Sequence, residues 1–498
     1  MDHPIELLRA GRFEAAIALA ARQAQANPAA PQAWVMLAHV QLTARRPEAA
    51  LAACDAGLAA APGSPDLACA KAGVLRSLSR IAEAQALYDQ VLAAAPDHFD
   101  AGFGAALMAL EAGDWAAADG WLRRLAPGRA ARPDLQWLAA RAALGLGDVE
   151  AARAALTALT ATPELAPEPR AEALLLLGEA LDRLGRPDQA FAAAVEGKAI
   201  QRRLYAERAA GREGAARRFN RLAAWFGAAD PAAWRAGPAA ISGPGEPQTH
   251  VFLVGFPRSG TTLVEQALAG HPQVVSLEEA PTLAEAHAEF LASDEGLARL
   301  AQLSETEAQA WRARYWAAVA AHGVDPAGRV FLDKAPAATE DLPLVARLFP
   351  RAKVLFAIRD PRDVVLSCLR QSFQMNALTY AFTDLAAAAE AYGACMALAE
   401  VYRAVLPLEL HEVRHEALLD DFEGGLSAIC RTLGLSFEPA MADPAATARR
   451  RSVRTPSAPQ VRAGLNRLGL GRWRAYAPAL APVLPQLQPW IARFGYPG

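Results

Sequence analysis

The N-terminal part of the chain repeats one short phrase at a nearly constant interval, and this periodicity restricts the fold more than any other feature. Six copies start 33 to 38 residues apart: GRFEAAI at Gly11, RPEAALA at Arg46, IAEAQAL at Ile81, DWAAADG at Asp114, DVEAARA at Asp148 and RPDQAFA at Arg186. A repeat of this length is one supersecondary unit, which buries its apolar face only against neighbouring copies. The sequence therefore predicts a stacked array.

Each repeat has the pattern of a helix pair, rich in Ala, Leu, Arg and Glu with apolar residues at helical spacing. Prolines recur one repeat apart, where the second helix of a pair should end: Pro28, Pro62, Pro96, Pro127 and Pro163. Small residues are expected where two helices approach closely: Ala15, Ala49, Ala84, Ala117 and Ala151. The period is that of tetratricopeptide repeats, so we expect an all-α solenoid of five to six antiparallel pairs.

A solenoid of this kind leaves a long concave face exposed. That face either recruits a partner protein or peptide or serves as a scaffold, for example in a homo-oligomer, because repeat folds have many roles. Both interpretations stay open at the level of sequence.

The length and composition require a second core. A chain of 498 residues with 53% hydrophobic content is expected to fold as more than one domain. Residues 206–247 are dense in Pro and Gly and are predicted to be a linker. The expected organisation is a repeat domain at 1–205, the linker, and a second domain at 248–498.

Charge and cysteine usage restrict the partners and the compartment. A formal net charge of −3 provides no global basic field, which argues against nucleic acid as a partner. We expect a cytoplasmic protein with no membrane partner, because no leader pattern opens the chain and no eighteen uncharged apolar residues run together. Five scattered cysteines are expected to be reduced core residues: Cys54, Cys69, Cys368, Cys395 and Cys430.

The second domain opens with a strand, a tight loop and a helix. Residues 249–255 (THVFLVG) form an apolar run, 256–262 (FPRSGTT) form the loop, and an apolar periodic stretch follows. Gly255 and Gly260 have the spacing of a phosphate-binding P-loop, in which backbone N–H groups turn toward an anion at a helix start. Thr261 stands where nucleoside-triphosphate enzymes have Lys, and Arg258 supplies a cation within the loop.

A second anion-binding pattern follows the apolar strand 353–358 (KVLFAI). Arg359 stands at the carboxyl end of this strand, Pro361 suits the first turn of a helix, and Ser367 lies further along that helix. Ligands of open parallel sheets bind at the carboxyl edge. We therefore expect an α/β domain with a parallel sheet and two anion-binding elements at one edge.

The motif PRSGTT after a buried strand resembles the 5′-phosphosulfate loop of sulfotransferases that use 3′-phosphoadenosine 5′-phosphosulfate (PAPS). The tyrosylprotein sulfotransferases and the bacterial repeat-containing sulfotransferases are the most similar in pattern. The resemblance implies that the 5′ end of the donor is held by Arg258, Ser259, Gly260, Thr261 and Thr262. It also implies that Arg359 and Ser367 hold the 3′-phosphate.

The resemblance extends to two later segments. The tail RTPSAPQVRAGLNRLGLGRWRAY resembles the family's C-terminal segment, which implies nucleotide contacts for Ser457 and Arg472, although the usual Pro and Ser are missing. VRHEALL resembles the family's V-x-Y-E-x-L element, with His415 in place of the Tyr. His415 is accordingly a candidate nucleotide contact, and an ordinary core or surface histidine is the alternative.

Sulfuryl transfer needs a base for the acceptor proton and cations for the charge that develops on the leaving phosphate. The resemblance implies Glu279 as the base, next to Glu278, and Lys334 as the cation that acts together with Arg258. His271 is the rival base, but its GHP turn favours a structural role. No metal is expected.

Three functions remain open from the sequence. The first is PAPS-dependent sulfation of a hydroxyl acceptor, for which a tyrosine of a protein or peptide held by the repeats is one candidate. The second is a nucleotide phosphotransferase with a modified P-loop, and the third is a non-catalytic repeat adaptor.

Overall fold

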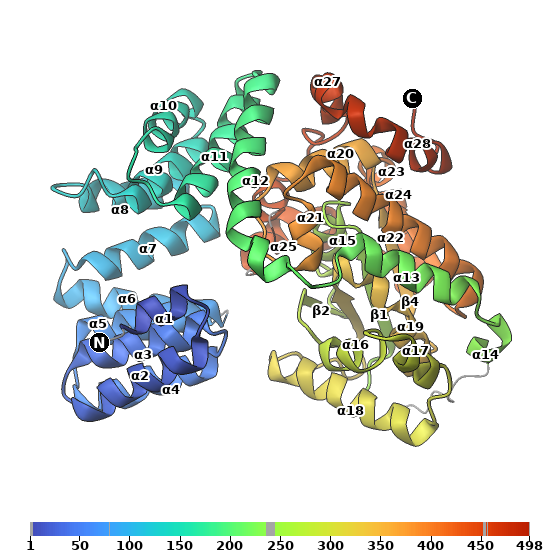
Figure 1. The fold of residues 1–498 in the computed structure, drawn as a ribbon, viewed down its shortest axis with the longest axis horizontal. Coiled ribbons are helices and arrows are strands. Elements are labelled where there is room, and N and C mark those ends of the chain that lie inside the picture. Colours follow the sequence, from blue (N-terminus) through green and yellow to red (C-terminus); the bar gives the residue numbers. More distant parts are fainter. Residues whose placement is uncertain (1–2, 79, 236–244, 452–454, 456, 498) are drawn as a thin grey trace. The chain divides into compact units, whose positions relative to one another are not determined.

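The computed structural model describes residues 3–78, 80–235, 245–451, 455 and 457–497. The chain divides into two compact units, Met1–Pro163 and Glu164–Gly498. The first unit is all helical, and the second combines helices with one parallel sheet, as expected (Figure 1). None of the described helices has the length and apolar content needed to cross a bilayer.

The first unit consists of successive helix pairs joined by short turns. Its helices are α1 (Pro4–Arg9), α2 (Phe13–Ala26), α3 (Pro31–Thr43), α4 (Pro47–Ala60), α5 (Pro65–Ser77), α6 (Ile81–Ala94), α7 (Phe99–Ala112), α8 (Trp115–Leu125), α9 (Pro133–Leu146) and α10 (Val149–Thr160). Each packs against its sequence neighbours. The repeat prediction is confirmed, and each predicted proline lies just beyond the second helix of a pair.

Four of the five close helix contacts lie one position later than predicted. The fourth residue of each second helix is completely buried, and these residues are Ala16, Ala50, Ala84, Ala118 and Ala152. Only Ala84 was among the predicted alanines. Because each residue turns an α-helix by about 100°, the alanines one position earlier lie beside the contact and remain partly or fully accessible.

Gly104 of α7 shows how tightly the helices of the first unit pack. A Cβ atom built there would lie 2.2 Å from the ring of the buried Tyr88. We expect Gly104→Ala to lower the free energy of unfolding of this unit by about 1–3 kcal/mol, because an overpacked core must shift. Gly120→Ala is the matched control for chemical denaturation of the full chain. Gly120 is a helical glycine with open space around it, so its substitution should stabilise slightly; equal effects would contradict the prediction.

The second unit begins within the repeats. Its first helices are α11 (Pro167–Arg183) and α12 (Pro187–Ala209), so the predicted boundary at residue 205 falls inside a helix. Part of the predicted linker is also helical, in α13 (Ala215–Gly227) and α14 (Pro231–Arg235), while 236–244 lies outside the described residues. Tertiary packing explains the difference, because Phe226 of α13 contacts Tyr402 with ring centroids 5.0 Å apart.

The sheet has five parallel strands in the order β2-β3-β1-β4-β5. The strands are β1 (Thr249–Gly255), β2 (Val274–Glu278), β3 (Val330–Lys334), β4 (Lys353–Ile358) and β5 (Leu410–Arg414). With β1 in the centre, the chain first runs to one side and later to the other. In open sheets, ligands bind at the carboxyl ends of the strands beside such a reversal.

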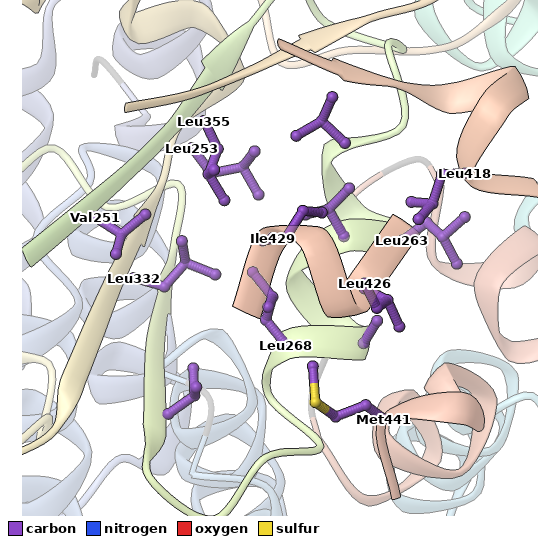
Figure 2. Close-up of a cluster of buried hydrophobic side chains, with 14 of the residues drawn as sticks. Val251, Leu253, Leu263, Leu268, Leu332, Leu355, Leu418, Leu426, Ile429 and Met441 are labelled. Atoms are coloured by element: carbon purple, nitrogen blue, oxygen red, sulfur yellow. The ribbon is translucent and has the colours of Figure 1, made fainter. Parts of the chain in front are cut away.

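Helices cover both faces of the sheet. On one face, α15 (Thr261–Leu268) and α24 (Phe422–Leu433) bury aliphatic side chains against β1, β3 and β4 (Figure 2). On the other, α18 (Glu305–Ala321), α19 (Leu342–Leu348) and α22 (Leu385–Val405) accompany aromatic residues such as Phe252 and Tyr315. The five cysteines are free and buried, which confirms the prediction that they serve the core.

Candidate functional site

The loop between β1 and α15 has the backbone conformation that the glycines predict. Gly255 and Gly260 have positive φ angles of 151° and 94°. A Cβ atom on Gly255 would lie 2.6 Å from the carbonyl oxygen of Ala357, so the loop tolerates no side chain there. Helix geometry leaves the N–H groups of Gly260, Thr261 and Thr262 without intrahelical acceptors, and this part of the loop is suited to an anion.

Arg258 lies at the tip of the loop with a left-handed backbone, φ 73°. Its buried guanidinium donates from Nε to Ser367 Oγ (2.9 Å), from Nη1 to Ser457 Oγ (2.5 Å) and from Nη2 to Gln460 Oε1 (2.9 Å). All three acceptors are neutral, and none of the described carboxylates bonds this cation. Burial, followed by the nearby charge of Arg359, lowers the pKa of Arg258 to about 10, and the charge of Glu279 offsets this only in part.

Arg359 follows β4 and extends toward the same loop. Its Nη1 donates to the carbonyl oxygen of Arg258 (3.2 Å), and its Nη2 donates to the carbonyl oxygen of Gly469 in the tail. Its Nε is buried and has no partner among the described residues. The structure thus brings Arg258, Arg359, Ser367 and Ser457 together, although they come from three separate segments.

His415 begins α23 (His415–Asp420) and packs its ring against the loop. A Cβ atom on Gly260 would lie 2.4 Å from His415 Nδ1, which is buried and has no partner within the described chain. Burial, followed by the charges of Arg359 and Arg258, lowers the pKa of His415 to about 3, so the ring is neutral. The loop is also tied to the tail by the hydroxyls of Thr262 and Thr455, which lie 3.0 Å apart.

Lys334, at the end of β3, is fully buried among three carboxylates. Its Nζ lies 2.8 Å from Glu279 Oε1, 3.2 Å from Glu278 Oε1 and 3.5 Å from Glu265 Oε2. Burial acts to lower the pKa of Lys334, but Glu265, Glu279 and Glu278 outweigh it and the pKa is raised. Lys334 therefore stays protonated at the carboxyl edge of the sheet.

The two adjacent acids differ in exposure. Glu278 is the last residue of β2, whereas Glu279 leaves the strand with φ 48° and its side chain is 45% exposed. Arg258 and Glu279 are two of the three non-glycine residues with positive φ in the described chain, and such strain concentrates at functional sites. Of the two acids, Glu279 is the more exposed, and its role as the base stays a prediction.

Two further residues considered from the sequence make their bonds within the protein, and for His271 this agrees with the structural role that its GHP turn favours. Arg472 binds Asp182 of α11, with Nη2 2.6 Å from Oδ1, so its guanidinium is occupied by a protein carboxylate rather than available to a nucleotide. Arg472 departs from the expected nucleotide contact because its partner, Asp182, is far away in the sequence. The Nδ1 of His271 accepts from the backbone N–H of Gln273 at 3.0 Å, which gives this histidine a role in its turn.

Sequence reasoning missed two members of this arrangement. Glu265 lies on α15, is fully buried, and forms an ion pair with Lys334. Burial raises the pKa of Glu265, and the charge of Lys334 opposes this. A lone acid within the apolar stretch LVEQALAG was a usable signal. Gln460, which binds Arg258, carries no such signal, because an exposed glutamine in a tail is unremarkable in a sequence.

Comparison with known families divides the chain in a similar way. The sulfotransferase family model matches residues 250–439, and tetratricopeptide repeat models match residues 7–73, 69–134 and 138–199. The chain contains a sulfotransferase domain. Within the matched part of this domain lie the loop, Arg359, Ser367 and His415, whereas Ser457 and Arg472 follow it. The last repeat match extends into the second compact unit.

Individual relatives of the chain are distant. An uncharacterized protein of Aquifex aeolicus is 28% identical over 264 residues, which cover 50% of this chain and 33% of that protein. Protein-tyrosine sulfotransferase 2 of Gallus gallus is 28% identical over 267 residues, covering 49% and 69%. The solved sulfotransferase domain of the Synechococcus PCC 7002 olefin synthase is 24% identical, covering 48% and 98%, with a TM-score of 0.32.

Proposed function

We propose that this chain transfers a sulfuryl group from PAPS to a hydroxyl acceptor. The observation that carries the proposal is the buried Arg258 cation, which has only neutral acceptors and lies beside a second cation, Arg359. Two such cations at the carboxyl edge of the sheet favour a ligand with several negative charges.

The residues around the loop fit a donor of this kind. The N–H groups at the start of α15 and Arg258 suit its phosphosulfate end, and Arg359 with Ser367 suits its 3′-phosphate. Two buried polar atoms beside the loop, Arg359 Nε and His415 Nδ1, have no partners in the described chain, so each has a bond to offer a ligand. When bound, the donor supplies an activated sulfuryl group.

The side chains at the ends of β2 and β3 supply the remaining chemistry. Glu279 takes the proton of the acceptor hydroxyl, since its carboxylate is accessible from solvent. Lys334 and Arg258 provide fixed positive charge for the phosphate that is released, and they require no reorganisation because packing and hydrogen bonds already hold them. Glu265 and Glu278 keep Lys334 charged in its buried position.

Calorimetry on the full chain tests donor recognition. We expect adenosine 3′,5′-bisphosphate to bind without magnesium, and to bind more tightly than ATP with or without magnesium. Preference for ATP with magnesium would instead indicate a phosphotransferase with a modified P-loop.

Transfer of labelled sulfate from PAPS tests the reaction itself. Glu279→Gln should lower kcat by about 100- to 10,000-fold, the usual contribution of a general base, with little change in nucleotide affinity. Glu278→Gln is the matched control and should retain much more activity, because its side chain is less accessible. Nucleotide binding without transfer to any acceptor would favour the adaptor function and contradict the proposal.

A tyrosine of a protein or peptide is our proposed acceptor. Its supports are the similarity to the Gallus gallus protein-tyrosine sulfotransferase 2 and the repeat array, a fold that commonly holds polypeptides. Transfer to tyrosine peptides should exceed transfer to saccharides and small phenols at equal concentration. Faster transfer to a saccharide or to a free phenol would overturn this choice of acceptor.

A further inference from the structure

Asp182, near the end of α11, contacts three side chains from two elements of the proposed donor site. Its Oδ2 lies 2.6 Å from Arg370 Nη2, at the end of α20 (Pro361–Arg370). Its Oδ1 lies 2.6 Å from Arg472 Nη2 and also accepts from the hydroxyl of Tyr476. Burial would raise the pKa of Asp182, but the charges and hydrogen bonds of these partners outweigh it and the pKa is lowered. A carboxylate of this repeat helix is thus held charged by the catalytic domain.

Two further residues of the same helix pair hold the segment just after α20. Lys198 of α12 is completely buried, and its Nζ donates to the carbonyl oxygen of Gln371 at 2.5 Å. Glu172 of α11 accepts from the hydroxyl of Ser372 at 2.7 Å. We call Glu172, Asp182 and Lys198 the clasp. It fixes the end of the helix whose earlier turn carries Ser367.

The tail segment 469–476, which Asp182 holds at one end, forms part of the wall of the proposed donor site at the other. Arg359 donates to the carbonyl oxygen of Gly469, and the backbone N–H groups of Gly471 and Trp473 donate to Asp363 of α20 at 2.7 and 2.8 Å. The position of this wall therefore depends on α20 and on Asp182 together.

We propose that Asp182 is a positioning residue for the donor site, and that α11 and α12 are a working part of the transfer unit as well as the last repeat. The proposal rests on the proposed PAPS-dependent function. Without the Asp182 charge, Arg370 and Arg472 repel each other, and Arg472 and Tyr476 lose the partner that orders the tail segment. The tail segment then spends more time away from the donor site, which weakens donor binding. The groups that take the acceptor proton and stabilise the leaving phosphate are unchanged.

The test compares Asp182→Asn with the intact chain. The KM for PAPS should rise about tenfold while kcat stays within about twofold, since charge-assisted hydrogen bonds are lost outside the reacting centre. Asp182→Glu keeps the charge and should recover part of the affinity. Glu179→Gln is the matched control on the same helix, because Glu179 pairs only with the exposed Arg183 in the described structure, and it should leave KM unchanged.

A second measurement does not depend on catalysis. Hydrogen exchange of the Gly471 and Trp473 amides should be faster in Asp182→Asn, and also in Arg472→Gln should the first variant fold poorly. Unchanged exchange in these variants would overturn the proposal, as would a loss of active enzyme with unchanged KM. If the intact chain fails to bind adenosine 3′,5′-bisphosphate, the proposed function fails, while the exchange comparison still decides whether Asp182 orders the tail.

Discussion

Lys334→Met is expected to lower kcat by about 100- to 1,000-fold, the usual effect of removing one preorganised charge from a transition state. Affinity for adenosine 3′,5′-bisphosphate should change only a few-fold, because the loop, Arg258 and Arg359 remain in place. Single-turnover transfer of labelled sulfate, together with calorimetry, measures both quantities. A variant that turns over normally at saturating PAPS but binds the nucleotide poorly would contradict the role that we assign to Lys334.

The variant carries a risk to folding, and the structure suggests how to control it. Removing Lys334 leaves the fully buried Glu265 with only Arg451, whose Nη1 lies 3.7 Å from Glu265 Oε1, and breaking a buried ion pair commonly costs about 3–5 kcal/mol. The double variant Lys334→Met/Glu265→Gln removes both charges. It should regain stability in chemical denaturation and remain slow in turnover, whereas recovery of turnover along with stability would show that the lysine acts only through the fold.

Arg258→Ala is expected to have the second large effect, on the donor side of the reaction. It removes the cation at the loop tip and the three hydrogen bonds that connect the loop to Ser367, Ser457 and Gln460. We expect kcat/KM for PAPS to fall by about 1,000-fold or more, because recognition of the donor and stabilisation of the leaving phosphate are lost together. Binding of adenosine 3′,5′-bisphosphate should weaken in the same variant.

Arg45→Ala is the matched control for this experiment. Arg45 also has a left-handed backbone, φ 61°, but it lies exposed in the first unit. The two substitutions therefore make the same change in the same backbone conformation. Arg45→Ala should leave kcat/KM unchanged, and a comparable loss in both variants would mean that a general effect on folding, rather than donor recognition, explains the Arg258 result.

Local patterns in the sequence were sufficient to predict much of the fold and the core of the candidate site. The repeat period predicted the helix pairs, and the apolar runs before Gly255 and Arg359 predicted β1 and β4. The glycine spacing predicted a loop whose conformation the structure reproduces. These features depend on residues a few positions apart, which is why hydrophobic periodicity and backbone sterics suffice to detect them.

The linker and the environment of Arg472 were harder to predict, for a common reason. Residues 206–247 have a loop-like composition, yet α13 forms because its apolar face packs against α22. Arg472 looks like an anion ligand until Asp182, nearly three hundred positions away, is placed beside it. Helix propensity and residue type are weak priors, and tertiary contacts override them.

The sequence by itself determined that helical repeats precede a parallel α/β domain with a glycine-containing loop after its first strand, because each of these properties depends on short-range spacing. Only the tertiary structure decided which charges meet: Lys334 with three carboxylates, Arg258 with neutral oxygens, and Asp182 with two arginines. Electrostatic energy depends on distance in space and on burial, and neither follows from separation along the chain.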